Sequence, residues 1–256
     1  SVKKEVASFA KALYKIDNFE IFGDFQVRNI DYNTNIISDG DGEGFVINKY
    51  WLFLNPKAGF NYKIQSGKLY FSYALANREP NRDDLQNNPE TEAEKLHDFE
   101  AGLEKSVGIF KFSTNLYWMN YQNQLVLNGE INDVGEFVRV NSGKSYRAGL
   151  EISAIANLSK QWMLSGNATF SKNENRDFRI ENSSGIQNLG NTPISFSPNI
   201  ISNFLVQYNP IEKLSLFLQN QYIGSQYLDN TNSDQLKLNS YILSDFNATY
   251  KLDFKK

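Results

Sequence analysis

The spacing of the connections between strand-like segments most constrains the fold of this chain. Apolar and polar residues alternate with a period of two along nearly the whole sequence, which is the pattern of β-strands. The joints between successive segments are short and long in strict turn, and the long joints are polar. We expect about eleven extended segments, near residues 4–14, 19–33, 46–63, 68–78, 96–106, 109–127, 145–158, 161–174, 198–209, 213–228 and 240–252.

In an up-and-down meander, this alternation places all short joints at one end and all long joints at the other. Transmembrane β-barrels of outer membranes have that asymmetry, with short periplasmic turns and long extracellular loops. A soluble β-sandwich has no reason to sort its loops so consistently, and several segments exceed the usual strand length of about 5–6 residues. We therefore predict an all-β fold with one domain over residues 1–256, an antiparallel up-and-down transmembrane β-barrel.

The strand number and the two ends of the sequence indicate that this barrel is partial. A strand pattern is already under way at Lys3, and the sequence stops just past another strand pattern at Phe254. An odd number of strands leaves an open edge, whereas bacterial barrels usually close with an even number. We expect the eleven segments to form the interior or later part of a larger barrel.

Composition agrees with a barrel and excludes several classes of function. The mean hydropathy is only −0.49, which a barrel explains because its outward face is apolar across the membrane alone and its lumen face is polar. No run approaches the roughly 20 apolar residues of a transmembrane helix. A net charge of −3 is too balanced to suggest a nucleic-acid partner. The absence of cysteine excludes a thiol nucleophile, a disulfide and a Cys-ligated metal.

The connection between residues 78 and 95 carries a dense group of charges. Hairpin loops are usually about 2–5 residues long, so a longer charged connection is usually functional or disordered. It opens with Arg78, Glu79, Pro80, Asn81, Arg82, Asp83 and Asp84. The only helix-like candidate in the chain, Thr91 to Leu96, follows in the same connection and is short.

This stretch resembles a strand–loop–strand signature of TonB-dependent outer-membrane receptors, especially those of Bacteroidetes-type bacteria. SYALANREPNRDDL is followed by NPETEAEKLHDFEAGLE. Later pieces that are similar to the family are LYWMNYQNQLVLNGEINDVGEFVRVNSGKSYRAGLEI, GNATFSKN, SPNIISNFLVQY and QYIGSQYLDNT. The positions that carry the first match are Arg78, Pro80, Arg82, Asp83, Asn88, Pro89, Glu90, Phe99, Glu100 and Gly102.

The resemblance implies a barrel of about 22 strands around a plug domain, of which this sequence would supply roughly half, without the plug, the TonB box or the closing strand. It implies active uptake of a scarce nutrient across the outer membrane of a Gram-negative bacterium. The implied partners are membrane lipid, the plug, the TonB–ExbB–ExbD energising complex and a small nutrient ligand, with no nucleic acid. A ferric siderophore or related iron chelate is the favoured ligand because that class is common in the family.

Two alternatives stay open at this point. Within the family, the cargo of such a transporter is in some members an oligosaccharide. In a different class, the chain would be a soluble β-rich carbohydrate-binding module, with its long loops as the binding face.

The charged group at the start of the long connection has two interpretations. In the first, Arg78 and Arg82 pair with neighbouring carboxylates and only fix the root of the loop. In the second, the group contacts the plug or an anionic ligand, because arginine suits bidentate recognition of carboxylates. The candidate ligand- or plug-contacting residues are Arg78, Glu79, Arg82, Asp83 and Asp84.

No constellation of residues supports an enzyme, a cofactor or a metal centre. His97 is the only histidine, which excludes a His-dependent triad and a histidine metal cluster. The carboxylates between Asp39 and Glu43 are spaced like part of a calcium loop but lack its distal glutamate. We expect that segment, and the Asp229–Asp234 run, to be solvated loops. Glu100 and Glu104 share one strand face, which a polar lumen explains.

Overall fold

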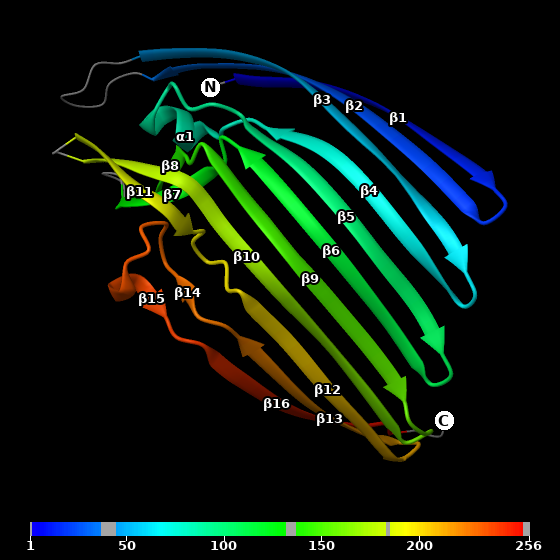
Figure 1. Ribbon diagram of the computed structural model, residues 1–256. Coiled ribbons are helices and arrows are strands. Elements are labelled where there is room, and N and C mark those ends of the chain that lie inside the picture. Colours follow the sequence, from blue (N-terminus) through cyan, green and yellow to red (C-terminus); the bar gives the residue numbers. More distant parts are fainter. Residues whose placement is uncertain (1, 37–44, 132–136, 183–184, 253–256) are drawn as a thin grey trace.

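The computed structural model describes residues 2–36, 45–131, 137–182 and 185–252, and these residues form one curved antiparallel wall (Figure 1). Its strands follow each other in chain order, and each inner strand of the wall pairs with one neighbour on either side. The strands of the wall are β1 Val2–Ile16, β2 Phe19–Ile36, β3 Phe45–Ile64, β4 Gly67–Arg78, β5 Glu94–Val107, β6 Phe110–Gln122, β9 Lys144–Asn157, β10 Trp162–Asn182, β12 Ile200–Ile211, β13 Leu214–Ile223 and β16 Tyr241–Tyr250.

These eleven strands correspond one to one with the eleven expected segments, so the predicted up-and-down topology is confirmed. Among the described residues, β1 pairs only with β2 and β16 only with β13, and the wall is open between these two edges. No helix in the described part of the chain is long and apolar enough to cross a membrane.

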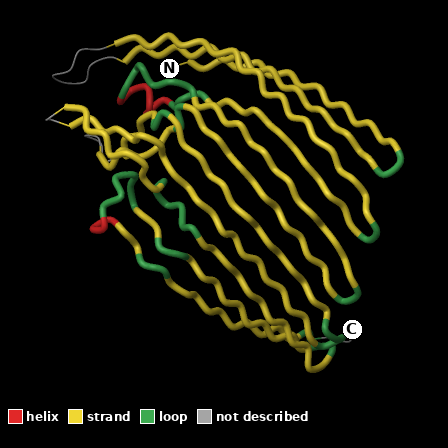
Figure 2. Tube along the Cα trace, in the orientation of Figure 1, coloured by secondary structure: helices red, strands yellow, loops and turns green. Residues whose placement is uncertain are grey.

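The predicted sorting of the connections is also confirmed. Figure 2 shows the short turns along one end of the wall and the longer connections at the other. Three of the short turns contain a residue in the left-handed region, Asp17 with φ 49°, Ser66 with φ 58° and Gly108 with φ 58°. A positive φ is what tight hairpin turns require. We call the two ends of the wall the turn end and the loop end.

The long connections carry secondary structure of their own. Helix α1, Arg82–Asn87, lies between β4 and β5, and the hairpin of β7, Leu125–Ile131, and β8, Phe137–Asn141, lies between β6 and β9. Strand β11, Gly185–Pro193, pairs with the upper part of β10. The remaining elements are β14 Gln226–Tyr227, the 3-10 helix Asp234–Leu236 and β15 Lys237–Leu238.

The helix expected at Thr91 to Leu96 is wrong. Residues 91–93 are irregular, and Glu94 already begins β5. The helix starts at Arg82 instead because Asn81 caps it. The backbone N–H of Asp84 donates to Oδ1 of Asn81 at 2.8 Å, and the N–H of Asn81 donates to Oδ2 of Asp84 at 2.9 Å. This reciprocal pair is a capping box, which satisfies two otherwise unpaired donors.

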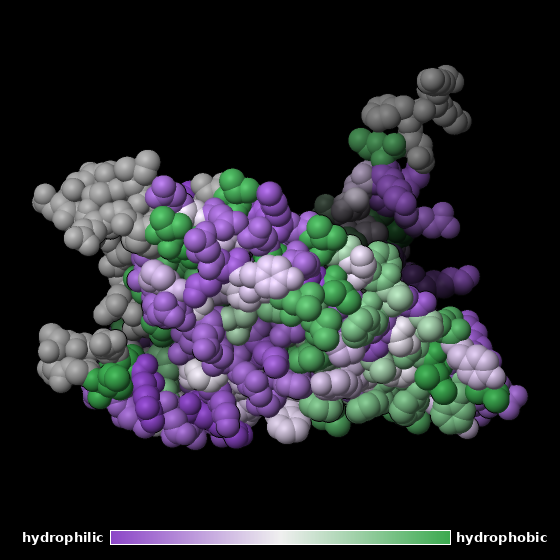
Figure 3. Space-filling model, turned by 90° about the horizontal axis from the view of Figure 1, so that it is seen from above, coloured by the Kyte–Doolittle hydropathy of each residue, from purple (hydrophilic) through white to green (hydrophobic). Residues whose placement is uncertain are grey.

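Strand alternation gives the wall one polar face and one apolar face. Across neighbouring strands, one polar row joins Ser72, Glu100, Tyr117, Gly149 and Ser171. The adjacent row on the other face joins Phe71, Ala101, Leu116, Leu150 and Phe170. In Figure 3, hydrophobic side chains predominate over the strand bodies and hydrophilic ones gather at the loop end.

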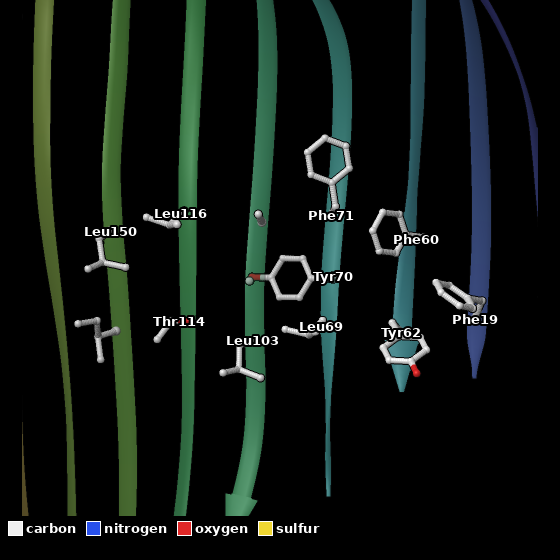
Figure 4. Close-up of a pocket in the computed structure, with 13 residues that line it drawn as sticks. Phe19, Phe60, Tyr62, Leu69, Tyr70, Phe71, Leu103, Thr114, Leu116 and Leu150 are labelled. Carbon is white, nitrogen blue, oxygen red and sulfur yellow. The ribbon is translucent and has the colours of Figure 1, made fainter. Parts of the chain in front are cut away.

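The apolar face is exposed because the described residues form no second layer over it. Leu116 is 58% exposed and Phe170 is 46% exposed. An apolar hollow of about 710 Å³ lies on this face (Figure 4). Ring centroids of Phe19 and Tyr62 lie 4.6 Å apart, and those of Phe60 and Phe71 lie 6.1 Å apart. A continuous apolar surface of this kind is stable against acyl chains and not against water.

On the polar face, three aromatic rings lie flat over glycines of the neighbouring strand. A Cβ atom at any of these glycines would overlap the ring. The absence of a side chain therefore lets each ring lie along the wall instead of standing away from it. The pairs are Phe22 with Gly59, Tyr70 with Gly102 and Tyr117 with Gly149.

The two faces should respond differently to the same charged side chain. We predict that Leu116→Arg, on the apolar face, lowers the free energy of unfolding in lipid vesicles by about 2–4 kcal/mol, because a charge then faces acyl chains. Asn167→Arg, on the polar face, is the matched control and should cost much less. Urea titration of vesicle-inserted protein measures both, and equal losses would contradict the assignment of the faces.

Candidate functional site

The five predicted contact residues lie together at the loop end. Arg78 is the last residue of β4, Glu79 follows it, and Arg82, Asp83 and Asp84 form the first turn of α1. Three of them are fastened to distant parts of the chain, as described below. Their partners differ from those predicted from the sequence.

Glu79 joins the first two strands to the long connection. Its Oε1 accepts from Nζ of Lys3 at 2.7 Å and from Nη2 of Arg28 at 3.1 Å. Arg28 also donates through Nε to Glu5 at 2.9 Å. Burial would raise the pKa of the Glu79 carboxyl, but the hydrogen bond from Lys3 and the charges of Arg28 and Lys3 lower the pKa below its ordinary value. Glu79 is therefore held ionised.

Asp84 and Leu85 fasten α1 on the polar face. The side chain of Asp84 is buried, and its Oδ1 accepts from Nε of Arg139 in β8 at 2.9 Å. Leu85 is 1% exposed and packs with Tyr32 of β2 and Ile47 of β3. Both strand residues lie on the polar face, so the helix folds inward over the wall.

Arg78 pairs with Glu94, the residue directly opposite it across the β4–β5 ladder, with Nη2 3.2 Å from Oε2. The predicted pairing of Arg78 and Arg82 within the charged group is therefore wrong for Arg78. The reason is geometric. The β4–β5 ladder places Glu94 next to Arg78, and the folded loop places Arg28 next to Glu79 and Arg139 next to Asp84. Arg82 and Asp83 are exposed and form no ion pair with the described residues. Contact of any of the five predicted residues with a ligand or plug stays a prediction.

The connections that follow β6, β10 and β13 are held together by hydrogen bonds of Asn230. Its Nδ2 donates to the backbone oxygen of Leu127 at 2.5 Å, and its Oδ1 accepts from the N–H of Ser195 at 2.9 Å and from Nδ2 of Asn175 at 3.1 Å. Asn230 is 0% exposed and Asp229 is 6% exposed. The expectation of a solvated loop from Asp229 to Asp234 is therefore wrong for its first two residues.

Two other sequence predictions have different outcomes. The candidate calcium segment from Asp39 to Glu43 lies outside the described residues. His97 lies near the start of β5, where its Nδ1 is 2.9 Å from the hydroxyl of Tyr73, so it has a structural partner. The described residues contain no group of three or more His, Cys, Asp or Glu arranged to hold a metal ion.

A polar cavity of about 300 Å³ opens on the polar face between β5, β6, β9, β10 and the segment 196–198. We call it the Arg147 cavity. Nη1 of Arg147 donates to Oγ of Ser197 at 2.8 Å. Nδ2 of Asn115 donates to Glu151 at 3.4 Å, whereas Oδ1 of Asn115 is buried without a partner among the described residues. Sequence reasoning named Glu100 in this cavity as a lumen carboxylate but missed Arg147, because nothing in its strand marks it.

The network around Glu79 should respond to acid. A carboxylate whose pKa is lowered by folding stabilises the folded state above its unfolded pKa, with an ordinary value of 4.5, and that stabilisation is lost as the pH falls through the lower folded value. We predict that the protection factors of the α1 amides, which are corrected for the intrinsic exchange rate at each pH, fall over this pH window in the wild type. Glu79→Gln should show fast exchange already at neutral pH, and Glu104→Gln, an exposed carboxylate at the turn end, is the control. A wild-type profile in Glu79→Gln would overturn the role of this network.

Asn230 offers a second test of the locked loops. Asn230→Ala leaves buried backbone and amide groups without partners, so we predict that the free energy for opening the Ser195 amide falls by about 1–3 kcal/mol. Hydrogen exchange at that amide measures the change. Asn239→Ala, at an exposed position of the same connection, should leave exchange at Ser195 unaltered; an equal effect in both variants would refute the lock.

Comparison with known proteins identifies the family. The family model TonB dependent receptor-like, beta-barrel, matches residues 2–256. The catecholate siderophore receptor Fiu of Escherichia coli strain UTI89 is 21% identical over 253 residues, which cover 84% of this chain and 32% of that protein. The siderophore receptor PiuA from Acinetobacter baumannii superposes with a TM-score of 0.81 at 16% identity, covering 98% of this chain and 37% of that chain. The ferric citrate transporter FecA gives a TM-score of 0.78 at 17% identity, covering 99% and 38%.

This chain thus spans about a third of the length of the proteins that it matches. The matches to solved structures agree with the wall of antiparallel strands described above, and the family model extends over almost the whole chain. The family is one of receptors and not of enzymes. The chain belongs to the TonB-dependent receptor β-barrel family of the Gram-negative outer membrane.

Proposed function

We propose that the protein is an outer-membrane receptor that takes up a ferric siderophore or a related iron chelate. The observation that carries this proposal is the two-faced wall: an exposed apolar face suited to lipid and a polar face suited to a passage for a hydrophilic ligand. Relatives named as a catecholate siderophore receptor and a siderophore receptor support an iron chelate as the ligand.

Each part of the wall has a place in this proposal. The apolar face holds the barrel among acyl chains, and the polar face lines the route of the ligand. The fastened loops keep the outer opening in a fixed shape, because Glu79, Asp84 and Asn230 tie them to the strands and to each other. Arg82 and Asp83 are exposed charged residues of the predicted group that form no ion pair with the described residues, and there they would meet the ligand or the plug.

The energy for uptake would come from outside this chain. We infer that a plug domain fills the lumen and that the TonB–ExbB–ExbD complex acts on the plug. In this scheme the described residues bind, orient and guide the ligand, and none of them performs covalent chemistry.

The soluble carbohydrate-binding module that the sequence left open is not compatible with this wall. Its strand bodies expose large apolar side chains such as Leu116 and Trp118, and the buried apolar residues gather at the loop end. A soluble module requires the opposite arrangement, with one strand face covered by a core.

Uptake of radioactive iron by whole cells tests the proposed function. We predict that cells grown under iron limitation accumulate ⁵⁵Fe from a ferric chelate, and that deleting the gene for this protein or for TonB abolishes the accumulation. Restoring the gene on a plasmid is the control. Unchanged iron uptake in the deletion strain, together with lost growth on an oligosaccharide, would replace the iron proposal with the sugar alternative.

A further inference from the structure

We propose that the apolar face of the wall binds, at its loop end, the phosphorylated sugar headgroup of a glycolipid in the outer leaflet. The proposal goes beyond uptake, because it concerns the outward side of the wall and not the route of a ligand. It rests on four strands that lie side by side, β5, β6, β9 and β10 (Figure 1). Along these strands the outward side chains are first apolar, then hydrogen-bonding and finally cationic toward the loop end.

Three cations lie in one row across these strands. Lys95 and Lys144 lie on either side of Gln122 in the ladders of β6 with β5 and β9. Arg176 lies directly opposite Lys144 in the next ladder. We call Lys95, Lys144 and Arg176 the cation row. Neighbouring strands are about 4.8 Å apart, so the row extends over about 14 Å. It belongs to the apolar face, because its members lie an even number of residues from the row of Ala101, Leu116, Leu150 and Phe170.

The positive charge of the cation row has no counterion in the described part of the chain. All three side chains belong to exposed residues and form no ion pair with the described residues. Lys144 and Arg176 are like charges directly opposite each other on one face, an arrangement that destabilises a sheet unless an anion compensates it. The cation row therefore favours an anion from outside the chain.

The carboxylate closest along the strand is already engaged. Among the described residues, Glu174 is the only carboxylate on this face of the four strands. Its Oε1 lies 2.8 Å from Nζ of Lys172, and its Oε2 accepts from the hydroxyl of Tyr146 at 2.7 Å. One carboxylate thus faces four cations, and its hydrogen bonds go to Lys172 and Tyr146 and not to the cation row.

Arg176 is placed to receive a phosphate group. Its guanidinium carbon lies 4.9 Å from the centre of the Tyr146 ring, a cation–π contact that holds the cation against the wall. The guanidinium donates no hydrogen bond to the described residues. Its five N–H donors are therefore available, and their planar arrangement suits the oxygen atoms of a phosphate.

A row of hydrogen-bonding side chains lies next to the cation row, toward the turn end. Its members can donate to and accept from the hydroxyl groups of a sugar. They are His97, Asn120, Tyr146 and Glu174.

The following row marks the boundary of the acyl chains. Phe99 and Trp118 are directly opposite each other, with stacked rings whose centroids lie 5.8 Å apart. Tryptophan is enriched at the level where acyl chains meet headgroups. Lys95 lies four positions beyond Phe99 in β5, or about 13 Å along the strand. The cation row is thus separated from the acyl region by a distance that a headgroup must span.

A phosphorylated glycolipid matches the three layers in their order. Its acyl chains would pack on Phe99 and Trp118, its sugar would contact the hydrogen-bonding row, and its phosphate would reach the cation row. In a glycerophospholipid, only the glycerol separates the phosphate from the acyl chains. Its phosphate would therefore lie at the hydrogen-bonding row, short of the cations.

Lipid titration followed by native mass spectrometry tests the site. The protein is purified from its own outer membranes in detergent, in the form that its cell makes, and is freed of bound lipid by detergent exchange. The probes are lipid A with its phosphate groups, the same lipid A after phosphatase treatment, and phosphatidylglycerol. We expect the wild type to bind phosphorylated lipid A at least about 10-fold more tightly than either of the other lipids.

Variants of the cation row accompany this measurement. Each cation near a membrane surface contributes about 5-fold to the affinity for an anionic headgroup. Lys144→Gln should therefore weaken the binding of phosphorylated lipid A by about 5-fold, and replacement of all three cations by glutamine should weaken it by about 100-fold. The matched control removes three exposed lysines of the turn end, through Lys111→Gln, Lys160→Gln and Lys251→Gln. It should stay within about 2-fold of the wild type, because these positions lie at the other end of the wall.

Four outcomes would overturn the proposal. Equal binding of the two forms of lipid A would show that the phosphate is not recognised, and equal binding of phosphatidylglycerol would show that the sugar is not. An equal loss in the turn-end control would show a response to total charge alone. Wild-type affinity in the folded triple variant would remove the cation row from the site. Faster migration on gels without boiling shows that a variant is folded, and Lys144→Gln provides the test if the triple variant does not fold. Iron uptake is independent of these outcomes, because the cation row faces away from the lumen.

Discussion

Backbone hydrogen bonding in a medium without water is the constraint on which this structure depends. In hydrocarbon every N–H and C=O group must find a partner within the protein, and a sheet does this only through neighbouring strands. The ladders between β2 and β3, β4 and β5, and β5 and β6 satisfy that demand along most of the strand length, and β3 pairs with β4 from Lys57 to Ile64. Because the wall is one layer thick, its two faces meet different surroundings, and the alternation of side chains follows directly from that.

The constraint is relaxed at the loop end, and a different set of interactions takes over. There the chain reaches water, so stability comes from ion pairs, a capped helix and buried amides instead of lipid contact. Glu79 forms ion pairs with two cations, Lys3 and Arg28, and so joins three segments of the chain. Asp84 belongs to the capping box of α1 and also pairs with Arg139. Hydrogen bonds of Asn230 join three connections. These fastenings turn separate loops into one connected layer above the wall.

The sequence was sufficient to predict the strands, their order and the sorting of the connections, because each depends on patterns that are local in the chain. It was insufficient for the partners of the charged group. Lys3, Arg28 and Arg139 are distant from Glu79 and Asp84 in sequence, and only the folded loop brings them together. Asn230 was missed because a buried asparagine and a solvated one look alike in a polar run. Arg147 could not be singled out from the sequence, because only the structure shows which of the other cations have carboxylate partners.

The flat aromatic rings of the polar face have a consequence for the evolution of this wall. Each ring occupies the space that a side chain at the facing glycine would need, so neither member of a pair can change freely while the other is kept. A methyl group at Gly102 would drive the Tyr70 ring away from the strand, and a smaller residue at Tyr70 would leave Gly102 uncovered. The two positions of each pair are thereby coupled, and substitutions at them are expected to be inherited together across adjacent strands.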